Sequence, residues 1–151
     1  MRIVTATTRD LKLLVPLFEA YRAFYGCAAA PARSAAYLRQ RLTRREAVVF
    51  LAVEGSGPGR TGLGFTLLYP TQSSLSMARA WVLNDLYVAP EGRRSGVARA
   101  LMERGRRHAI RTAAAYLTLE TADSNRKAQR LYESSGWTRE RGFRHYLLAL
   151  R

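Results

Sequence analysis

Hydrophobic and polar positions follow two different periods along this chain, and each period indicates one kind of element. Apolar side chains at helical spacing run from Leu11 to Tyr25, and the same spacing returns after Gly96. Short apolar or alternating runs between glycine, proline and polar residues indicate strands. We therefore expect helices at 11–25, 33–42, 97–111 and 125–135, and strands at 2–6, 46–54, 62–69, 78–88, 116–121, 137–140 and 143–150.

The resulting order of elements is β-α-α-β-β-β-α-β-α-β-β. The turn at 56–59 joins two strands as a hairpin, and the polar stretch 70–76 is expected to be a loop. A chain of 151 residues, of which 48% are hydrophobic, has room for one sizeable core. No repeat, linker or low-complexity tract divides the sequence. The order of elements therefore predicts a single α/β domain over 1–151.

Composition excludes several classes of protein. Cys27 is the only cysteine, so an intramolecular disulfide and a cysteine-rich metal site are both excluded, and no metal is expected. No apolar run approaches the roughly 18 residues that a membrane-spanning helix needs. Met1 to Thr5 leads directly into a strand pattern, without the layout of a signal peptide. The simplest expectation is a cytoplasmic protein with no membrane partner.

The net charge of +14 raises the question of a polyanionic partner. Arginine outnumbers lysine 23 to 2, a bias that codon composition alone can produce, and the arginines are spread along the chain. A nucleic-acid partner is therefore not expected. We expect instead that a few of the arginines bind the phosphate groups of a cofactor.

A basic loop containing glycine joins the strand 78–88 to the helix that follows it. Gly96 allows the backbone to approach a ligand closely, and Ala98 leaves the first helical turn uncluttered. Unpaired N–H groups and the helix dipole, roughly +0.5 charge, favour an anion at this point. Arg93 and Arg94 add two full positive charges. The stretch predicts a phosphate-binding loop.

Two motifs give this loop a family resemblance. Arg93-x-x-Gly96-x-Ala98, preceded by a Leu-x-Val strand, resembles the acetyl-CoA pyrophosphate loop of the GNAT acetyltransferase superfamily. The segment 119–125, LETADSN, with Tyr132 and Gly136-Trp137 after it, resembles that family's second cofactor motif. The patterns G-x-x-x-x-G-K and G-x-G-x-x-G are both absent, which excludes a Walker loop and a dinucleotide fingerprint.

The resemblance implies a fold and a cosubstrate. The fold would be a GNAT-like mixed, mostly antiparallel sheet of about six to seven strands, flanked by about four helices. The strands ending at Val88 and at Thr121 would splay apart, and the pantetheine arm of acetyl-CoA would bond to the backbone of Leu86 and Val88 and to Asn125. The loop residues expected to contact the pyrophosphate are Arg93, Arg94, Ser95, Gly96, Val97 and Ala98.

Acetyl transfer to an amine needs a base for the amine and an acid for the thiolate that leaves. Tyr132 is the candidate acid, because a phenol of pKa about 10 can donate to a thiolate whose conjugate acid lies near 8.5. It also occupies the family's position in the pattern Asn-x6-Tyr, counted from Asn125. Glu120 is the preferred base: it alternates away from the apolar positions of its strand, and it stands five residues before Asn125, as in the ribosomal-protein N-terminal acetyltransferases of this superfamily.

The acceptor side is determined less sharply. Asp85 interrupts an apolar strand near the expected bulge, where it could hold a cationic acceptor, relay a proton or only fix the bulge. Tyr21, Tyr25 and Tyr69 are candidates for stacking on a cation, and their surroundings resemble a subgroup related to histone and polyamine acetyltransferases. A small amine, an amino acid and a peptide or lysine amine all remain open as acceptors.

The sequence thus favours direct N-acetyl transfer from acetyl-CoA without an acyl-enzyme, since Cys27 lies outside both motifs. The alternatives are a non-catalytic acyl-CoA-binding module and, less favoured, a basic nucleic-acid-binding domain. His108 lies outside the motifs and is expected at the helix surface or the edge of the core. The terminal strands leave edges that need cover, and a homodimer is one way to cover them.

Overall fold

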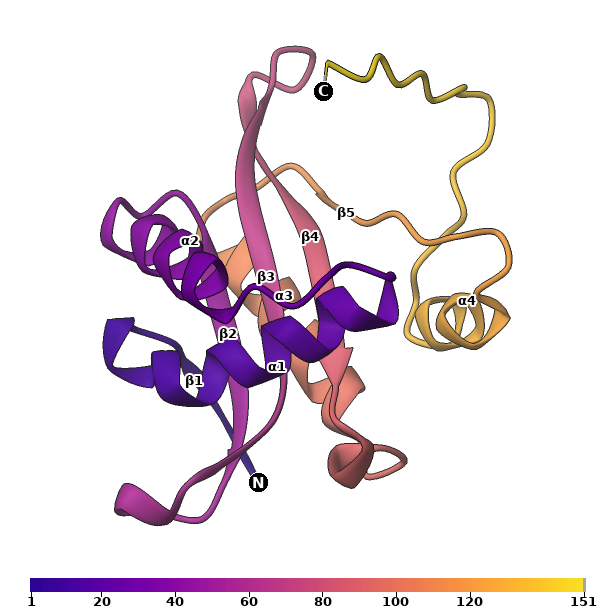
Figure 1. Cartoon of the computed structure of the whole chain (residues 1–151). Helices are drawn as coiled ribbons and strands as arrows, with labels where there is room; N and C mark the ends of the chain where they lie inside the picture. Colours follow the sequence, from indigo (N-terminus) through magenta and orange to yellow (C-terminus); the bar gives the residue numbers. More distant parts are fainter. Residues whose placement is uncertain (151) are drawn as a thin grey trace. The chain divides into compact units, whose positions relative to one another are not determined.

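The computed structural model describes residues 1–150 and divides into two compact units, one of Met1–Glu120 and a smaller one that begins at Thr121. Helix α4 (Arg126–Glu133) belongs to the second unit. The first unit holds the other helices and all the strands of the described chain (Figure 1). These elements are β1 (Arg2–Thr5), α1 (Leu11–Phe24), α2 (Pro31–Thr43), β2 (Val48–Glu54), β3 (Thr61–Ser73), β4 (Ala78–Val88), α3 (Val97–Arg111) and β5 (Leu117–Thr118), with short 3₁₀ turns at Thr8–Asp10, Gly57–Gly59 and Pro90–Gly92.

The five strands form one sheet in the order β1-β2-β3-β4-β5. The first three pairings are antiparallel, and only β4 and β5 run parallel. This arrangement confirms the predicted fold class of a mixed, mostly antiparallel sheet flanked by helices.

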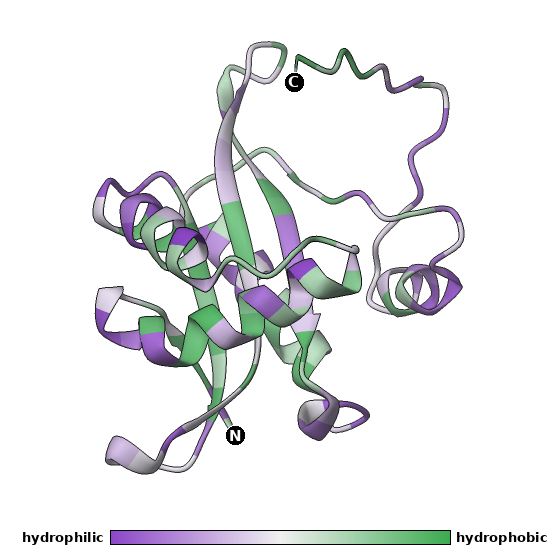
Figure 2. Cartoon of the chain, in the orientation of Figure 1, coloured by the Kyte–Doolittle hydropathy of each residue, from purple (hydrophilic) through white to green (hydrophobic). Residues whose placement is uncertain are grey.

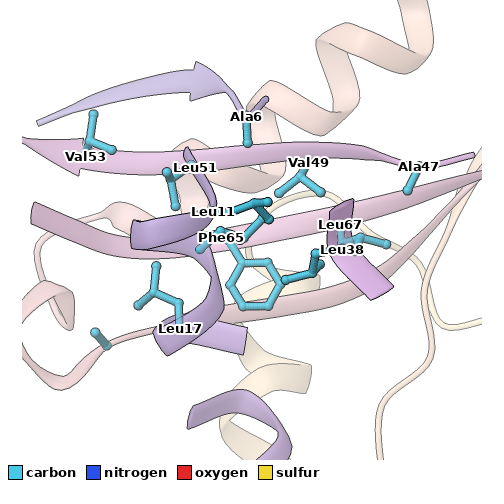
Figure 3. Packing of buried hydrophobic residues seen from close by; sticks show 12 residues of the cluster. Ala6, Leu11, Leu17, Leu38, Ala47, Val49, Leu51, Val53, Phe65 and Leu67 are labelled. Carbon is cyan, nitrogen blue, oxygen red and sulfur yellow. The ribbon is translucent and has the colours of Figure 1, made fainter. Parts of the chain in front are cut away.

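The main core lies between the sheet and the helices α1 and α2. Leu11, Leu14 and Leu17 of α1 meet the alternate residues of the strands, such as Leu51 and Phe65 (Figure 3). This packing follows from period: a stripe of leucines three residues apart on a helix faces every second residue of a strand. Hydrophobic stretches accordingly run along β2, β3 and β4 (Figure 2).

Helix α3 covers the opposite face of the sheet. Its Gly105 lies against the side chains of Leu68 and Leu83. The His108 ring packs edge-on against Trp81, with ring centroids 4.6 Å apart, and against Phe50 at 5.5 Å. Burial and three nearby arginines lower the pKa of His108. The histidine is thus at the edge of the core.

Strand β3 extends into the stretch 70–76 that the sequence predicts as a loop, because it continues to Ser73. Pro70 pairs with Trp81 of β4. Strand β2 begins at Val48, opposite Leu68, so β3 has no β2 neighbour at Pro70. Proline is tolerated there because an edge position needs no N–H bond to a second strand.

The sheet has fewer strands than predicted. β5 covers only Leu117–Thr118 instead of 116–121, and the expected strands 137–140 and 143–150 are not formed in the described chain. Residues 143–150 keep their apolar side chains exposed, with Leu147 86% and Leu150 88% accessible. Alternation marks a segment suited to pairing, but a strand also needs a neighbour that accepts its backbone bonds.

Gly64 holds β3 close to β4. A Cβ placed on it would lie 2.5 Å from the Tyr87 carbonyl oxygen and 3.1 Å from the Val88 Cα. We expect Gly64→Ala to destabilise the protein by about 1–3 kcal/mol, the range for overpacking. The measurement is urea unfolding. Gly59→Ala is the control, because a Cβ on Gly59 meets no atom within 4 Å; equal stability of the two variants would contradict the close packing.

Candidate functional site

The basic loop after β4 is anchored to β3. The Ala89 N–H donates to the Leu63 carbonyl at 2.9 Å, and the buried Gly92 lies so close that a Cβ would be 3.0 Å from the same oxygen. The Pro90–Gly92 turn therefore rests on the end of the β2–β3 hairpin. The residues that follow, 93–96, are exposed. The loop thus has an anchored first part, residues 89–92, and an exposed rim, residues 93–96.

Two residues of this rim have left-handed backbone conformations. Gly96 has φ +83° and Arg94 has φ +62°. The Ser95 hydroxyl donates to the Gly92 carbonyl at 2.7 Å, which holds the turn between them. Left-handed residues alternating with ordinary ones direct successive N–H groups into one concavity, which is a common anion-binding geometry.

The N-terminus of α3 completes this concavity. Gly96 is the N-cap residue and has no side chain to bond the amides of Val97 and Ala98. The Ala100 N–H donates to the Gly96 carbonyl at 3.0 Å and closes the first turn, so the amides before it have no acceptor within the helix. The end of the helix dipole adds partial positive charge. The predicted loop residues 93–98 thus lie together, with a geometry suited to a phosphate.

The two loop arginines differ in their contacts. Arg93 Nε donates to the Val88 carbonyl at 3.1 Å, which ties the loop to the last residue of β4. That bond uses one of the five N–H groups of the guanidinium. Arg94 is exposed. Both charges border the row of amides.

Leu86 and Val88 lie in the part of β4 that β5 does not cover. The parallel pairing joins Trp81 to Leu117 and Val82 to Thr118, and it ends there. β4 continues to Val88, still paired with β3 on its other edge. In the described chain, the second edge of β4 after Val82 therefore has no strand neighbour.

A register shift in the β3–β4 pairing determines where Asp85 points. Leu67 pairs with Asp85 and Leu68 pairs with Leu83, so Asn84 is an extra residue. A bulge of this kind re-aims the side chains beside it. It places Asp85 on the same face as Leu67, the face that α1 and α2 cover, and confirms the bulge expected near Asp85.

Asp85 is buried, with 5% of its surface exposed. Its carboxylate accepts hydrogen bonds from the Tyr21 hydroxyl and from Asn84 Nδ2, the latter at 3.0 Å. Burial raises the pKa of the Asp85 carboxyl, and these two hydrogen bonds oppose the shift without cancelling it.

The tyrosines predicted to bind the acceptor amine belong to one aromatic cluster. The Tyr21 ring lies 5.1 Å from Tyr25 and 6.0 Å from Phe65, both edge-on. The Tyr69 hydroxyl is hydrogen-bonded to the hydroxyl of Tyr37, a residue that the sequence analysis did not identify. Tyr37 and Tyr69 are 32 residues apart, and no local pattern in the sequence marks such a pair.

Glu120 is exposed and lies two residues beyond the end of β5. The strand alternation used to assign it a face therefore does not extend to it. Its spacing from Asn125 remains the support for its role.

In the second unit, Asn125 is the N-cap of α4, and its side-chain oxygen accepts from the Ala128 N–H at 3.2 Å. This bond uses the side-chain oxygen of Asn125 and does not involve its NH₂ group. Tyr132, on the last turn of α4, is partly buried, with its ring 6.3 Å from Trp137.

Within residues 1–150, no group of three or more His, Cys, Asp or Glu side chains is arranged to hold a metal ion. The same described residues include no helix long and apolar enough to cross a membrane.

Comparison with known proteins decides the family. Residues 14–137 match the acetyltransferase (GNAT) family. The chain belongs to the GNAT acetyltransferase family. It is 41% identical to an uncharacterized N-acetyltransferase, YhfO, of Bacillus subtilis (strain 168), over 98% of this chain and 97% of that protein.

Solved structures place this GNAT chain among acetyltransferases too. A crystal structure of a probable acetyltransferase is 43% identical, with a TM-score of 0.93 over 100% of this chain and 99% of that one. A ribosomal-protein-alanine N-acetyltransferase from Brucella melitensis biovar Abortus 2308 is 21% identical, with a TM-score of 0.80 over 99% of both chains. At that identity, the second comparison shows the fold alone.

The left-handed Gly96 allows a test of the loop. We expect Gly96→Ala to weaken acetyl-CoA binding several-fold, because alanine is strained at φ +83° and turns the neighbouring amides away. Calorimetric titration with acetyl-CoA measures this. Gly57→Ala is the control. Gly57 lies in the β2–β3 turn, outside the loop, and alanine is also strained at its φ of +58°, with no atom within 4 Å of the added Cβ. Equal loss in both variants would remove the loop's role.

Proposed function

We propose that this GNAT protein transfers an acetyl group from acetyl-CoA directly to a primary amine. The observation that carries the proposal is the loop 93–98, in which the left-handed residues, the uncapped amides of α3 and two arginines surround one concavity. A pyrophosphate has the charge and the oxygen acceptors that suit these donors. The family match over 14–137 supports the same reading.

The remaining cosubstrate contacts follow from the family resemblance. The pantetheine arm bonds to backbone groups of Leu86 and Val88 and to the side-chain amide of Asn125. The family match extends across the boundary between the two units at Glu120 and Thr121. This supports the proposal that the whole chain, 1–151, forms one N-acetyltransferase domain.

The proposed chemistry needs a neutral amine. A primary amine with pKa about 10.4 is mostly protonated at pH 7, which costs roughly 4–5 kcal/mol for the reactive form. Glu120 accepts that proton, directly or through water. The amine nitrogen then forms a bond to the acetyl carbon and loses its second proton to water, which gives a neutral amide nitrogen. The C–S bond breaks, the Tyr132 hydroxyl donates its proton to the departing thiolate, and the phenolate takes a proton back from water.

Removing the phenolic proton tests the proposed acid. We expect Tyr132→Phe to lower kcat about 10²-fold or more, the low end for a general acid, while the affinity for acetyl-CoA stays within twofold. Free-thiol release measures turnover, and calorimetry measures binding. Tyr116→Phe loses an exposed hydroxyl outside both motifs and is the control. An unchanged kcat in Tyr132→Phe would exclude Tyr132 as the acid.

The pH dependence of the rate tests the proposed base. Glu120→Gln is expected to lower kcat/KM most at neutral pH and to recover partly at high pH, because hydroxide and the neutral amine become abundant there. The rate is measured from pH 6 to 10. Glu54→Gln removes an exposed carboxylate at the end of β2 and is expected to leave the profile unchanged. A loss that is equal at every pH would contradict a role as base.

A further inference from the structure

Among residues 1–150, no positively charged side chain pairs with the buried carboxylate of Asp85, although the chain is rich in positive charge. The chain has 25 lysines and arginines, yet the contacts of the Asp85 side chain within the described residues are with the neutral donors Tyr21 and Asn84. The other buried aspartate, Asp10, forms an ion pair with Arg60 at 2.9 Å. The two carboxylates therefore differ in how their charge is balanced.

This arrangement is costly for the fold alone. Removing an ionised carboxylate from water costs several kcal/mol unless an opposite charge compensates. The residue opposite Asp85 is Leu67, which is fully buried, so an apolar side chain would suit the surroundings better. Retaining a carboxylate here is readily explained if the positive charge arrives with a ligand.

The surroundings of Asp85 have the chemistry that recognises an organic cation. Aromatic rings from α1, α2 and β3 lie side by side: Phe18 stacks on Tyr37 at 6.1 Å, and Tyr21 packs against Phe65. Burial, the bond to Tyr37 and the nearby charge of Asp85 raise the pKa of Tyr69, which keeps its hydroxyl protonated. Ring faces and neutral hydroxyls attract a cation without opposing Asp85.

Solvent exposure decreases across the aromatic cluster toward Asp85. Tyr25 is 56% exposed and Tyr37 is 37% exposed, Tyr21 and Tyr69 are partly buried, and Asp85 is 5% exposed. A ligand that lays its apolar part on the outer rings and directs one ammonium inward would match both properties.

We propose that the acceptor is a small amine with a single positive charge and an apolar body, whose ammonium group pairs with Asp85 and whose body packs on the rings of Tyr21, Tyr25, Tyr37 and Tyr69. This inference rests on the proposed acetyl transfer and names its acceptor class. Asp85 acts as the positioning carboxylate that binds the incoming ammonium. Glu120 keeps the role of base and removes one proton from that same nitrogen before it attacks the acetyl carbon.

Charge disfavours two other classes of acceptor, α-amino acids and polyamines. An α-amino acid carries a carboxylate beside its ammonium, which would be brought close to Asp85 and repelled. A polyamine carries further cations, and the guanidinium of Arg41 already lies 5.0 Å from the Tyr37 ring centroid at the outer part of the cluster. A single ammonium avoids both conflicts.

Binding without acetyl-CoA tests the acceptor class independently of turnover. The probes are 2-phenylethylamine, L-phenylalanine and 2-phenylethanol, which share one ring and differ in charge, together with spermidine. Calorimetry with the full chain is expected to give an affinity for 2-phenylethylamine at least tenfold higher than for the other three. Equal or tighter binding of L-phenylalanine, 2-phenylethanol or spermidine would overturn the proposal.

Two variants separate a binding role from a structural one. Asp85→Asn keeps the size of the side chain and one acceptor oxygen for the donors Tyr21 and Asn84. It is expected to weaken 2-phenylethylamine binding at least tenfold while leaving the thermal midpoint at pH 7 equal to or above that of the parent. Glu54→Gln is expected to change neither quantity. Unchanged amine binding in Asp85→Asn, or a clearly lower midpoint, would overturn the role given to Asp85.

The two proposals fail in different ways. If 2-phenylethylamine binds through Asp85 but no thiol is released from acetyl-CoA, the inference about the amine site holds and acetyl transfer fails. If thiol release is rapid with a polyamine or a peptide while 2-phenylethylamine does not bind, acetyl transfer holds and the inference about the acceptor fails.

Discussion

The single extra residue in the β3–β4 pairing is the constraint on which the rest of the site depends. Without the bulge at Asn84, strict alternation would put Asp85 on the same side as Leu83, facing α3. With the bulge, Asp85 faces α1 and meets Tyr21, while Leu83 still packs against Gly105. One extra residue therefore gives β4 an apolar contact with α3 on one face of the sheet and a polar contact with α1 on the other.

The same strand leads into the loop that we assign to the cosubstrate. Gly64 lets β3 approach the end of β4, and Gly92 lets the loop rest on Leu63. These close contacts hold the start of the loop in place, and Arg94 and Gly96, which follow it, have left-handed conformations. An anion-binding loop gains from such support, because amides that are already oriented lose little entropy when a phosphate binds.

Charge is used unevenly in this protein. The arginines behind the net charge of +14 are spread along the chain, and those at the loop have a specific proposed ligand, a pyrophosphate. Asp85 is the opposite case, since its carboxyl group is buried and, within the described residues, hydrogen-bonded to neutral donors alone. A strongly positive molecule repels amines at long range, so selection of a cation has to come from a local group of this kind.

The sequence by itself determined the helices, strands β1 to β4 and the loop, because hydrophobic period, glycine placement and motif spacing are local properties. It also identified Tyr132, Asn125 and Asp85 as candidates, and its prediction of two terminal strands was wrong because a strand needs a partner that alternation does not specify. The tertiary structure alone decided which face Asp85 takes, the pairing of Tyr37 with Tyr69 and the early end of β5. Each of these depends on the register between segments far apart in the chain, and no local period encodes register.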